Sequence, residues 1–170
     1  MTKIYTKKLV NVYEHKGKIV KTIPNKLDQR WFNLYNEFYE YDSRVVKIIN
    51  YENNKITMEK INFKCTLDEY TRKTDLDFTN KKLLNYFTQF SDIWNNFLKF
   101  SYEKFTDEIF MHNDYSLSNC VIDLDDNIRV IDPDSCKIVT PRSSKINLGT
   151  YFYASAQLLE VRKQYYDCLL

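Results

Sequence analysis

The sequence predicts an α+β fold made of two consecutive parts, one rich in strands and one rich in helices. Over residues 1–61, short β-prone segments alternate apolar and polar residues and surround a single amphipathic segment. Over residues 62–170, longer segments with helical spacing enclose one expected β-hairpin. A chain of 170 residues allows one domain, or one domain divided into two lobes, at roughly 100–200 residues per domain. We therefore expect an N-terminal lobe over 1–61 and a mainly helical C-terminal lobe over 62–170.

The N-terminal part contains four expected strands and one expected helix. The first two strands form a hairpin around a polar turn that contains Gly17, and Pro24 stops the second strand. The helix is expected over 26–41, because apolar residues recur there every three or four positions. The strands are expected at residues 9–13, 19–23, 45–50 and 55–60, and the buried helix positions are Leu27, Trp31, Leu34, Tyr35 and Phe38.

The C-terminal part is expected to hold three helices and a hairpin. A short helix begins at Thr66, where Glu69 completes a capping box. The second helix is long and has a continuous apolar side, whereas the strands of the hairpin fold over a polar turn. The helices are expected at residues 66–72, 80–103 and 149–168, the short strands at 109–111, 120–124 and 128–131, and a loop at 133–146.

Composition limits the classes of protein to which this chain can belong. The 25 Lys and Arg residues against 23 Asp and Glu residues leave a net charge of +2, so we expect no nucleic-acid partner. No stretch approaches the roughly 18 apolar residues that cross a bilayer, and no signal peptide is apparent, so a cytoplasmic protein without a membrane span is expected. The abundance of Lys, Asn, Ile and Tyr hints at an AT-rich genome, and for a phage or viral chain the compartment is the host cytoplasm.

One polar stretch carries the chemistry that the sequence predicts. Asp114 and Asn119 lie five residues apart in an expected loop, so their side chains can face one point, and the following hairpin returns Asp132 to that point. Asp and Asn oxygens are the hard ligands that Mg²⁺ takes, usually together with substrate phosphates. Asp114 can then accept a proton from an attacking hydroxyl, or orient it. Ordinary turn-capping carboxylates are the alternative explanation of the same residues.

The pattern H-x-D-x-x-x-x-N followed by I-D-x-D resembles the catalytic and metal-binding loops of the protein-kinase-like superfamily. It is most similar to the branch of aminoglycoside phosphotransferases and choline kinases. The resemblance implies a two-lobed fold and a reaction that uses ATP and Mg²⁺. It implies Asp114 as the catalytic base, Asn119 and Asp132 as magnesium ligands, and His112 as a packing residue that holds the loop. Asp134 is a candidate for an additional metal-binding or structural carboxylate.

The N-terminal part resembles the same superfamily. Lys21 in Ile-Val-Lys looks like the strand lysine that reaches the α- and β-phosphates of ATP. The family also implies a glutamate on the helix that pairs with this lysine. Glu37 is our first choice and Asp28 the second, although the apolar positions place the expected acid nearer Trp31. The segment resembling the hinge, whose backbone binds adenine, contains Met58, Glu59 and Ile61.

Two departures from the family pattern leave the function open. The chain has only 2 glycines, and residues 5–8, where a phosphate-covering loop is expected, contain none. After residue 134 only 36 residues remain (170 − 134), so the C-terminal lobe is abbreviated and the acceptor pocket is nearly absent. A large acceptor, a partner protein or a second copy would then complete the site. We expect transfer of the γ-phosphoryl group of ATP to a small-molecule or protein hydroxyl; the alternative is a pseudokinase-like module that binds a host or partner protein without catalysis.

Overall fold

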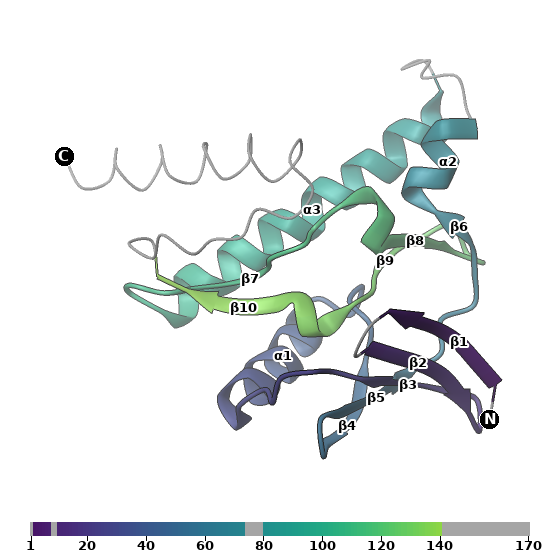
Figure 1. Cartoon of the computed structure of the whole chain (residues 1–170). Coiled ribbons are helices and arrows are strands. Elements are labelled where there is room, and N and C mark those ends of the chain that lie inside the picture. Colours follow the sequence, from purple (N-terminus) through teal and green to yellow (C-terminus); the bar gives the residue numbers. More distant parts are fainter. Residues whose placement is uncertain (1, 8–9, 74–79, 141–170) are drawn as a thin grey trace.

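The computed structural model describes residues 2–7, 10–73 and 80–140, which form an α+β fold with antiparallel sheets (Figure 1). The predicted α+β class is confirmed. The helix expected at 149–168 lies outside the described residues. The strands are β1 (Thr2–Lys7), β2 (Val10–His15), β3 (Lys18–Thr22), β4 (Ile48–Glu52), β5 (Lys55–Glu59), β6 (Phe63–Thr66), β7 (Ile109–His112), β8 (Cys120–Asp123), β9 (Ile128–Val130) and β10 (Cys136–Val139). The helices are α1 (Gln29–Tyr41), α2 (Leu67–Lys73) and α3 (Lys81–Lys104), with single 3₁₀ turns η1 (Leu117–Asn119) and η2 (Pro133–Ser135).

The first sheet has five strands in the order β1-β2-β3-β5-β4. Its two-residue hairpin turns are set by backbone conformations that few residues adopt. Lys16 and Gly17 have φ of 50° and 71°, and Asn53 and Asn54 have φ of 49° and 58°. Positive φ at both central residues is the geometry of a type I′ turn, which matches the twist of antiparallel strands and favours Gly and Asn. The predicted hairpin around Gly17 is confirmed, and the turns place β3 in the middle of the sheet.

Helix α1 begins three residues later than the sequence pattern predicts. Asp28 has an extended backbone, and its Oδ1 accepts a hydrogen bond of 2.6 Å from the backbone N–H of Trp31. This is an N-cap, so the helix starts at Gln29 rather than at residue 26. The predicted apolar face is otherwise confirmed, because the buried residues of the helix are Trp31, Leu34, Tyr35 and Phe38.

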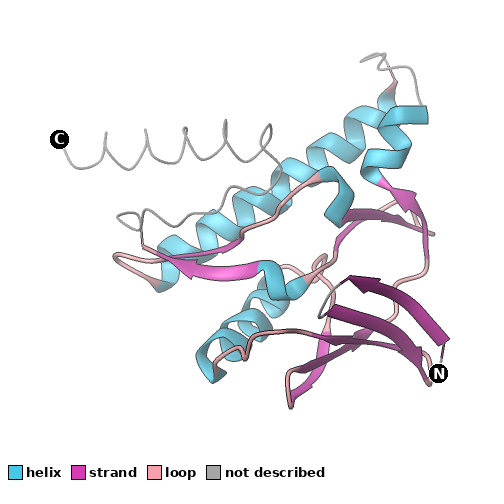
Figure 2. Ribbon diagram, in the orientation of Figure 1, coloured by secondary structure: helices cyan, strands magenta, loops and turns pink. Residues whose placement is uncertain are grey.

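Capping also fixes the ends of the other two helices. Thr66 and Glu69 form the predicted capping box, in which each side chain bonds to the backbone N–H of the other at 3.1 and 2.9 Å. Asn80 caps α3 by accepting from the N–H groups of Lys82 and Leu83. The long helix therefore forms almost as predicted, and Figure 2 shows it running beside the strands β7 and β10.

Three strands lie where the sequence predicts none, and each depends on a partner that is distant in the chain. β1 pairs with β2, β6 pairs with β8, and β10 pairs with β7. β10 falls in the segment 133–146 that we expected to be a loop. The strand expected at 45–50 is also displaced, since β4 begins at Ile48. Val45 instead forms a parallel bridge with Val130, and this bridge joins the two parts of the chain.

An aromatic cluster holds α1 against α3. The ring of Phe38 stacks on that of Phe97 with centroids 3.9 Å apart, and the rings of Phe100 and Phe110 surround the pair. All four side chains are almost completely buried. The cluster fixes α1 to the part of the chain that carries the predicted catalytic loop.

None of the helices in the described ranges is long and apolar enough to cross a membrane.

Replacing Phe38 with leucine should lower the free energy of unfolding by about 1–2 kcal/mol. The substitution keeps an apolar side chain but removes the ring contact with Phe97 and leaves part of the space unfilled. Urea unfolding followed by circular dichroism measures the difference. The control is Tyr102→Leu on the exposed side of α3, which should change the stability by less than about 0.5 kcal/mol. Equal effects of the two variants would contradict the central place of this cluster.

Candidate functional site

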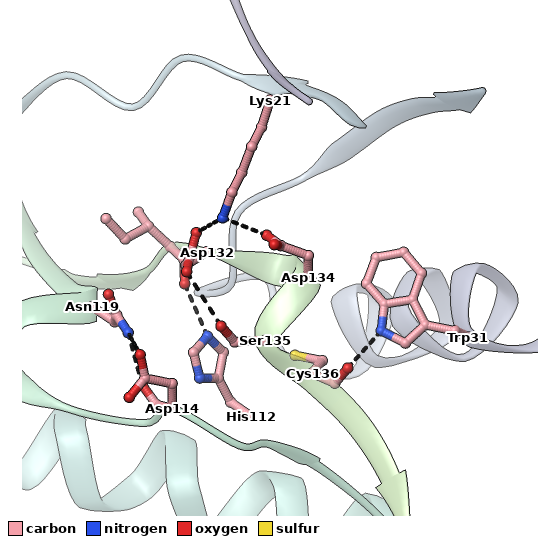
Figure 3. Close-up of polar contacts among 10 residues, drawn as sticks. Lys21, Trp31, His112, Asp114, Asn119, Asp132, Asp134, Ser135 and Cys136 are labelled. Atoms are coloured by element: carbon pink, nitrogen blue, oxygen red, sulfur yellow. Dashed lines mark hydrogen bonds and ion pairs between the residues drawn. The ribbon is translucent and has the colours of Figure 1, made fainter. Parts of the chain in front are cut away.

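Strand β3 and the segment after β9 meet at one lysine. Lys21 pairs with Val12 on β2 and Ile56 on β5, so its backbone lies in the interior of the five-stranded sheet. Its Nζ donates to Oδ1 of Asp132 and, at 2.7 Å, to Oδ1 of Asp134 (Figure 3). The structure thus brings together three of the residues predicted from the sequence.

A local backbone conformation aims the two carboxylates at Lys21. Asp132 has φ 68° and ψ 55°, in the left-handed region that a non-glycine residue adopts only at some cost. The single turn η2 follows, and within it the N–H of Ser135 donates to the carbonyl oxygen of Asp132 at 3.0 Å. The hydroxyl of Ser135 also donates to Oδ2 of Asp132 at 3.2 Å. Ser135 was not among the predicted site residues, although its spacing from Asp132 is that of a turn.

The predicted catalytic loop is closed by a contact between Asn119 and Asp114. The amide nitrogen of Asn119 donates to the backbone carbonyl of Asp114 at 2.8 Å and to its Oδ2 at 2.9 Å. The single turn η1 ends at Asn119, so the chain folds back and the amide of Asn119 approaches Asp114. The backbone carbonyl of Asn119 then accepts from the N–H of Ile131 at 2.9 Å. This bond places the loop next to the residue that precedes Asp132.

His112 is buried behind this loop. Its exposed fraction is 2%, and its Nε2 lies 3.0 Å from the carbonyl oxygen of Ile131. Because a carbonyl only accepts, Nε2 carries the proton, and Nδ1 is buried without a hydrogen-bond partner. Burial lowers the pKa of His112 and outweighs the opposite effects of its hydrogen bond and of the nearby aspartates. A neutral imidazole that supports the backbone before Asp132 is consistent with the predicted packing role.

The charges at the lysine shift the pKa values of Lys21 and Asp134. Burial lowers the pKa of Lys21, but the charges of Asp134 and Asp132 outweigh burial and raise it above its ordinary value. Burial and the neighbouring Asp132 raise the pKa of Asp134, because Lys21 compensates for only part of their effect. Two carboxylates and one ammonium leave the group with a formal excess of one negative charge, which favours a further cation.

The expected hinge residues border the first sheet. Met58 is 6% exposed and belongs to the core. The side chain of Glu59 contacts both parts of the chain, since its Oε1 accepts from Nη2 of Arg129 at 2.6 Å and from the backbone N–H of Lys47 at 2.8 Å. Ile61 follows β5 and is half-buried. Met58 and Glu59 belong to the paired strand β5, and the N–H of Glu59 donates to the carbonyl of Lys47 at 3.0 Å. The backbone of Ile61 is therefore the remaining candidate for binding an adenine ring.

The predicted acid on α1 does not meet Lys21. The exposed Glu37 pairs with Nζ of Lys104 at 2.6 Å, and Asp28 caps the helix. The expected pairing of Glu37 with Lys21 is therefore wrong for this structure, because Glu37 lies on the side of α1 that faces α3. The residue nearest the expected position is Trp31, whose indole N–H donates to the carbonyl of Cys136 at 2.8 Å. The apolar spacing of the helix predicted that Trp31 is buried, but it did not show that the indole N–H binds the carbonyl of Cys136.

The donor atoms at the site are all oxygens. Among the described residues there is no group of three or more His, Cys, Asp or Glu side chains arranged around a metal position. The predicted set consists of Asp132, Asp134 and the carboxamide of Asn119. Since the amide nitrogen of Asn119 is turned to Asp114, its Oδ1 is the atom left for a cation. One or two carboxylates and a carbonyl oxygen fit Mg²⁺, which usually keeps water and phosphate ligands as well.

A scan of the sequence against models of known protein families gives no match, and a search of curated proteins gives none either. The interpretation of the site therefore depends on its residues and their geometry.

The pKa of His112 makes the stability of the protein depend on pH. Because its folded-state pKa lies below the unfolded value, the unfolded chain binds more protons in this range, and stability falls as the pH drops below about 6.5. His112→Gln, which keeps a neutral donor, should reduce the loss in unfolding free energy between about pH 7.5 and 5.5. His15→Gln, at the exposed end of β2, is the control and should keep the wild-type loss. An identical loss in both variants would contradict the neutral, buried state of His112.

Proposed function

We propose that the protein is an ATP- and Mg²⁺-dependent phosphotransferase with the two-lobed arrangement of protein-kinase-like enzymes, residues 1–61 and 62–170 being its lobes. The observation that carries the proposal is the contact of Lys21 from the first part with Asp132 and Asp134 from the second. A buried lysine and two carboxylates of this kind are suited to hold a polyphosphate together with a divalent cation.

The nucleotide would lie between the first sheet and the catalytic loop. Lys21 would bind the α- and β-phosphates, since a compact ammonium is suited to phosphate oxygens. The adenine edge would meet the backbone after β5, at Ile61. Within the described ranges the backbone N–H and carbonyl of Ile61 have no hydrogen-bond partner, so they are available to a base. Met58 contributes an apolar wall to the core behind this segment.

The cation would be held by the carboxylate of Asp132 and the amide oxygen of Asn119. When bound, Mg²⁺ neutralises charge on the phosphate oxygens that it contacts. The chain holds both ligands in place before any cation arrives. Asn119 is fixed by its two bonds to Asp114, and Asp132 by its left-handed backbone and by Ser135. Such preorganisation lowers the cost of assembling the site when the nucleotide binds.

Asp114 would act on the acceptor. Its Oδ2 accepts from Asn119, which leaves Oδ1 for the hydroxyl of the acceptor. In the proposed reaction the acceptor oxygen forms a bond to the γ-phosphorus, the bond from that phosphorus to the β–γ bridging oxygen breaks, and the hydroxyl proton passes to Asp114. The products are a phosphate ester and ADP. Positioning and charge neutralisation supply most of the rate gain in reactions of this class.

The acceptor is a hydroxyl compound that the described residues do not enclose. Residues 141–170 are the part of the chain that remains for an acceptor pocket, and they lie outside the described ranges. A large acceptor, a protein partner or a second copy would complete the site. We propose no nucleic-acid partner, since the net charge is only +2.

A second candidate function is a pseudokinase-like module that binds a host or partner protein without catalysis. The observation that favours it is the absence of a bond from the α1 acids to Lys21, since Glu37 pairs with Lys104 instead. The complete set of Asp114, Asn119 and Asp132 favours the enzyme.

A thermal-shift measurement separates the two candidates. Binding to the folded state raises the melting temperature, so ATP with Mg²⁺ should raise it more than ATP with a chelator does. The measurement needs no knowledge of the acceptor. A melting temperature that is the same with ATP and Mg²⁺ as without them would favour the binding module.

Asp132→Ala should abolish the Mg²⁺-dependent turnover of ATP, with a loss of at least about 100-fold, because it removes a metal ligand. The assay follows γ-labelled and α-labelled ATP in parallel, and only the γ label should move to an acceptor in a host lysate. Movement of the α label would indicate nucleotide transfer instead. The control is Asp125→Ala, in the exposed β8–β9 turn, which should keep full turnover. Unchanged turnover in a folded Asp132→Ala variant would exclude the assigned role.

A further inference from the structure

Lys21 requires a counter-charge in every state of the site. Its side chain is 10% exposed, and an unpaired ammonium at such a depth is strongly unfavourable. In the structure Asp132 and Asp134 share this task. In the proposed function, on which this inference rests, Asp132 is a ligand of the cation. A carboxylate bound to a divalent cation no longer neutralises the lysine, so Asp134 is the carboxylate left to hold Lys21 in place beside the phosphates.

We propose that Asp134 is the residue that positions Lys21, in place of the acid expected on helix α1. Asp132 and Asp134 thus have separate tasks, although they lie on one short segment. Asp132 binds the cation, and Asp134 forms the ion pair that positions Lys21.

The positions of the two carboxylates support this division. The side chain of Asp132 is 33% exposed, whereas that of Asp134 is 19% exposed. In Figure 3, Asp132 lies on the side of Lys21 that faces Asn119, and Asp134 lies on the side that faces Trp31. Asp132 can therefore reach both the lysine and a cation at Asn119. Asp134 reaches the lysine from the opposite side.

Helix α1 acts on the lysine indirectly through Trp31. This residue is 4% exposed, and its indole N–H donates to the carbonyl of Cys136 at 2.8 Å, two residues after Asp134. The bond fixes the end of η2 and hence the direction of the Asp134 carboxylate. The two acids considered for this role are used elsewhere, Glu37 in the pair with Lys104 and Asp28 as the N-cap of α1. A backbone contact from α1 thus takes the place of a direct ion pair.

One backbone turn sets the direction of both carboxylates, because Asp132, the proposed metal ligand, and Asp134, the proposed partner of Lys21, lie in the segment 132–134. Helix α1 is held to α3 and its following loop by the ion pair of Arg30 with Glu108 and by the stacking of Phe38 on Phe97. These contacts hold α1 in place, so Trp31 stays in position to bind the carbonyl of Cys136 next to η2.

The test compares Asp134→Asn, Asp134→Glu and Asp132→Asn in the full-length protein. The readouts are kcat and KM for Mg²⁺-dependent ATP turnover, and the Mn²⁺ affinity of the complex with a non-hydrolysable ATP analogue, measured by electron paramagnetic resonance. Asp134→Asn should lower kcat by about 10- to 100-fold and leave the Mn²⁺ affinity within about threefold of wild type. Asp134→Glu should restore part of kcat. Asp132→Asn should lower the Mn²⁺ affinity by at least about tenfold.

A second variant tests the contact from α1. Trp31→Phe keeps an aromatic ring and removes the N–H that binds the Cys136 carbonyl. It should lower kcat in the same direction as Asp134→Asn, by a smaller factor, again without a change in Mn²⁺ affinity. A general loss of structure would instead weaken Mn²⁺ and nucleotide binding together.

Three results would overturn the assignment. A loss of Mn²⁺ affinity in Asp134→Asn equal to that in Asp132→Asn would make Asp134 a metal ligand. Unchanged turnover in Asp134→Asn, with an active wild type, would remove the positioning role and leave the proposed function intact. A wild-type protein without ATP turnover or nucleotide-dependent Mn²⁺ binding would reject the proposed function, and the assignment with it.

Discussion

The contact of the Lys21 ammonium with Asp132 and Asp134 is the interaction on which the arrangement of the site depends. It joins residues that are separated by 111 and 113 positions in the chain. Burying an ammonium and two carboxylates is unfavourable unless their hydrogen-bond geometry is good, so β3 and the segment after β9 have to be held at a fixed relative position. On one side β3 provides the lysine from the middle of a sheet. On the other, the left-handed backbone of Asp132 and the turn η2 aim the carboxylates.

Several buried contacts hold the segment after β9 in position. The bridge between Val45 and Val130 fixes the end of β9 to the segment before β4. His112 supports the carbonyl of Ile131, immediately before Asp132. From the other direction, Trp31 binds the carbonyl that follows η2. The segment with the two carboxylates is thus held at both ends by side chains that take no part in the chemistry.

The local features of the fold follow from the sequence, and the contacts between distant segments do not. The capping box of Thr66 and the I′ turn at Gly17 depend on neighbouring residues, so their signals are visible in the chain. The strand β10 has only four residues and exists because β7 lies beside it, a relation that periodicity does not show. The N-cap at Asp28 carried a local signal, but the apolar spacing extended the predicted helix past it.

The candidate site shows the same division. The spacing of Asp114, Asn119 and Asp132 predicted one shared location. In the structure Asn119 bonds Asp114, its backbone carbonyl accepts from Ile131, and the next residue, Asp132, bonds Lys21. The sequence could not show that Lys21 has no acidic partner on α1, because this depends on which face of the helix meets which neighbour. The indole of Trp31 on α1 bonds the carbonyl of Cys136, and the acidic partners of Lys21 come from the segment after β9.

A crystal structure with Mn²⁺ and a non-hydrolysable ATP analogue would locate the cation, because manganese gives an anomalous signal. We expect a manganese peak between Oδ1 of Asn119 and the carboxylate of Asp132. We also expect phosphate oxygens at Lys21 and a remaining bond from Lys21 to Asp134. Manganese and nucleotide bound away from these residues, or a nucleotide that does not contact Lys21, would contradict the assigned site.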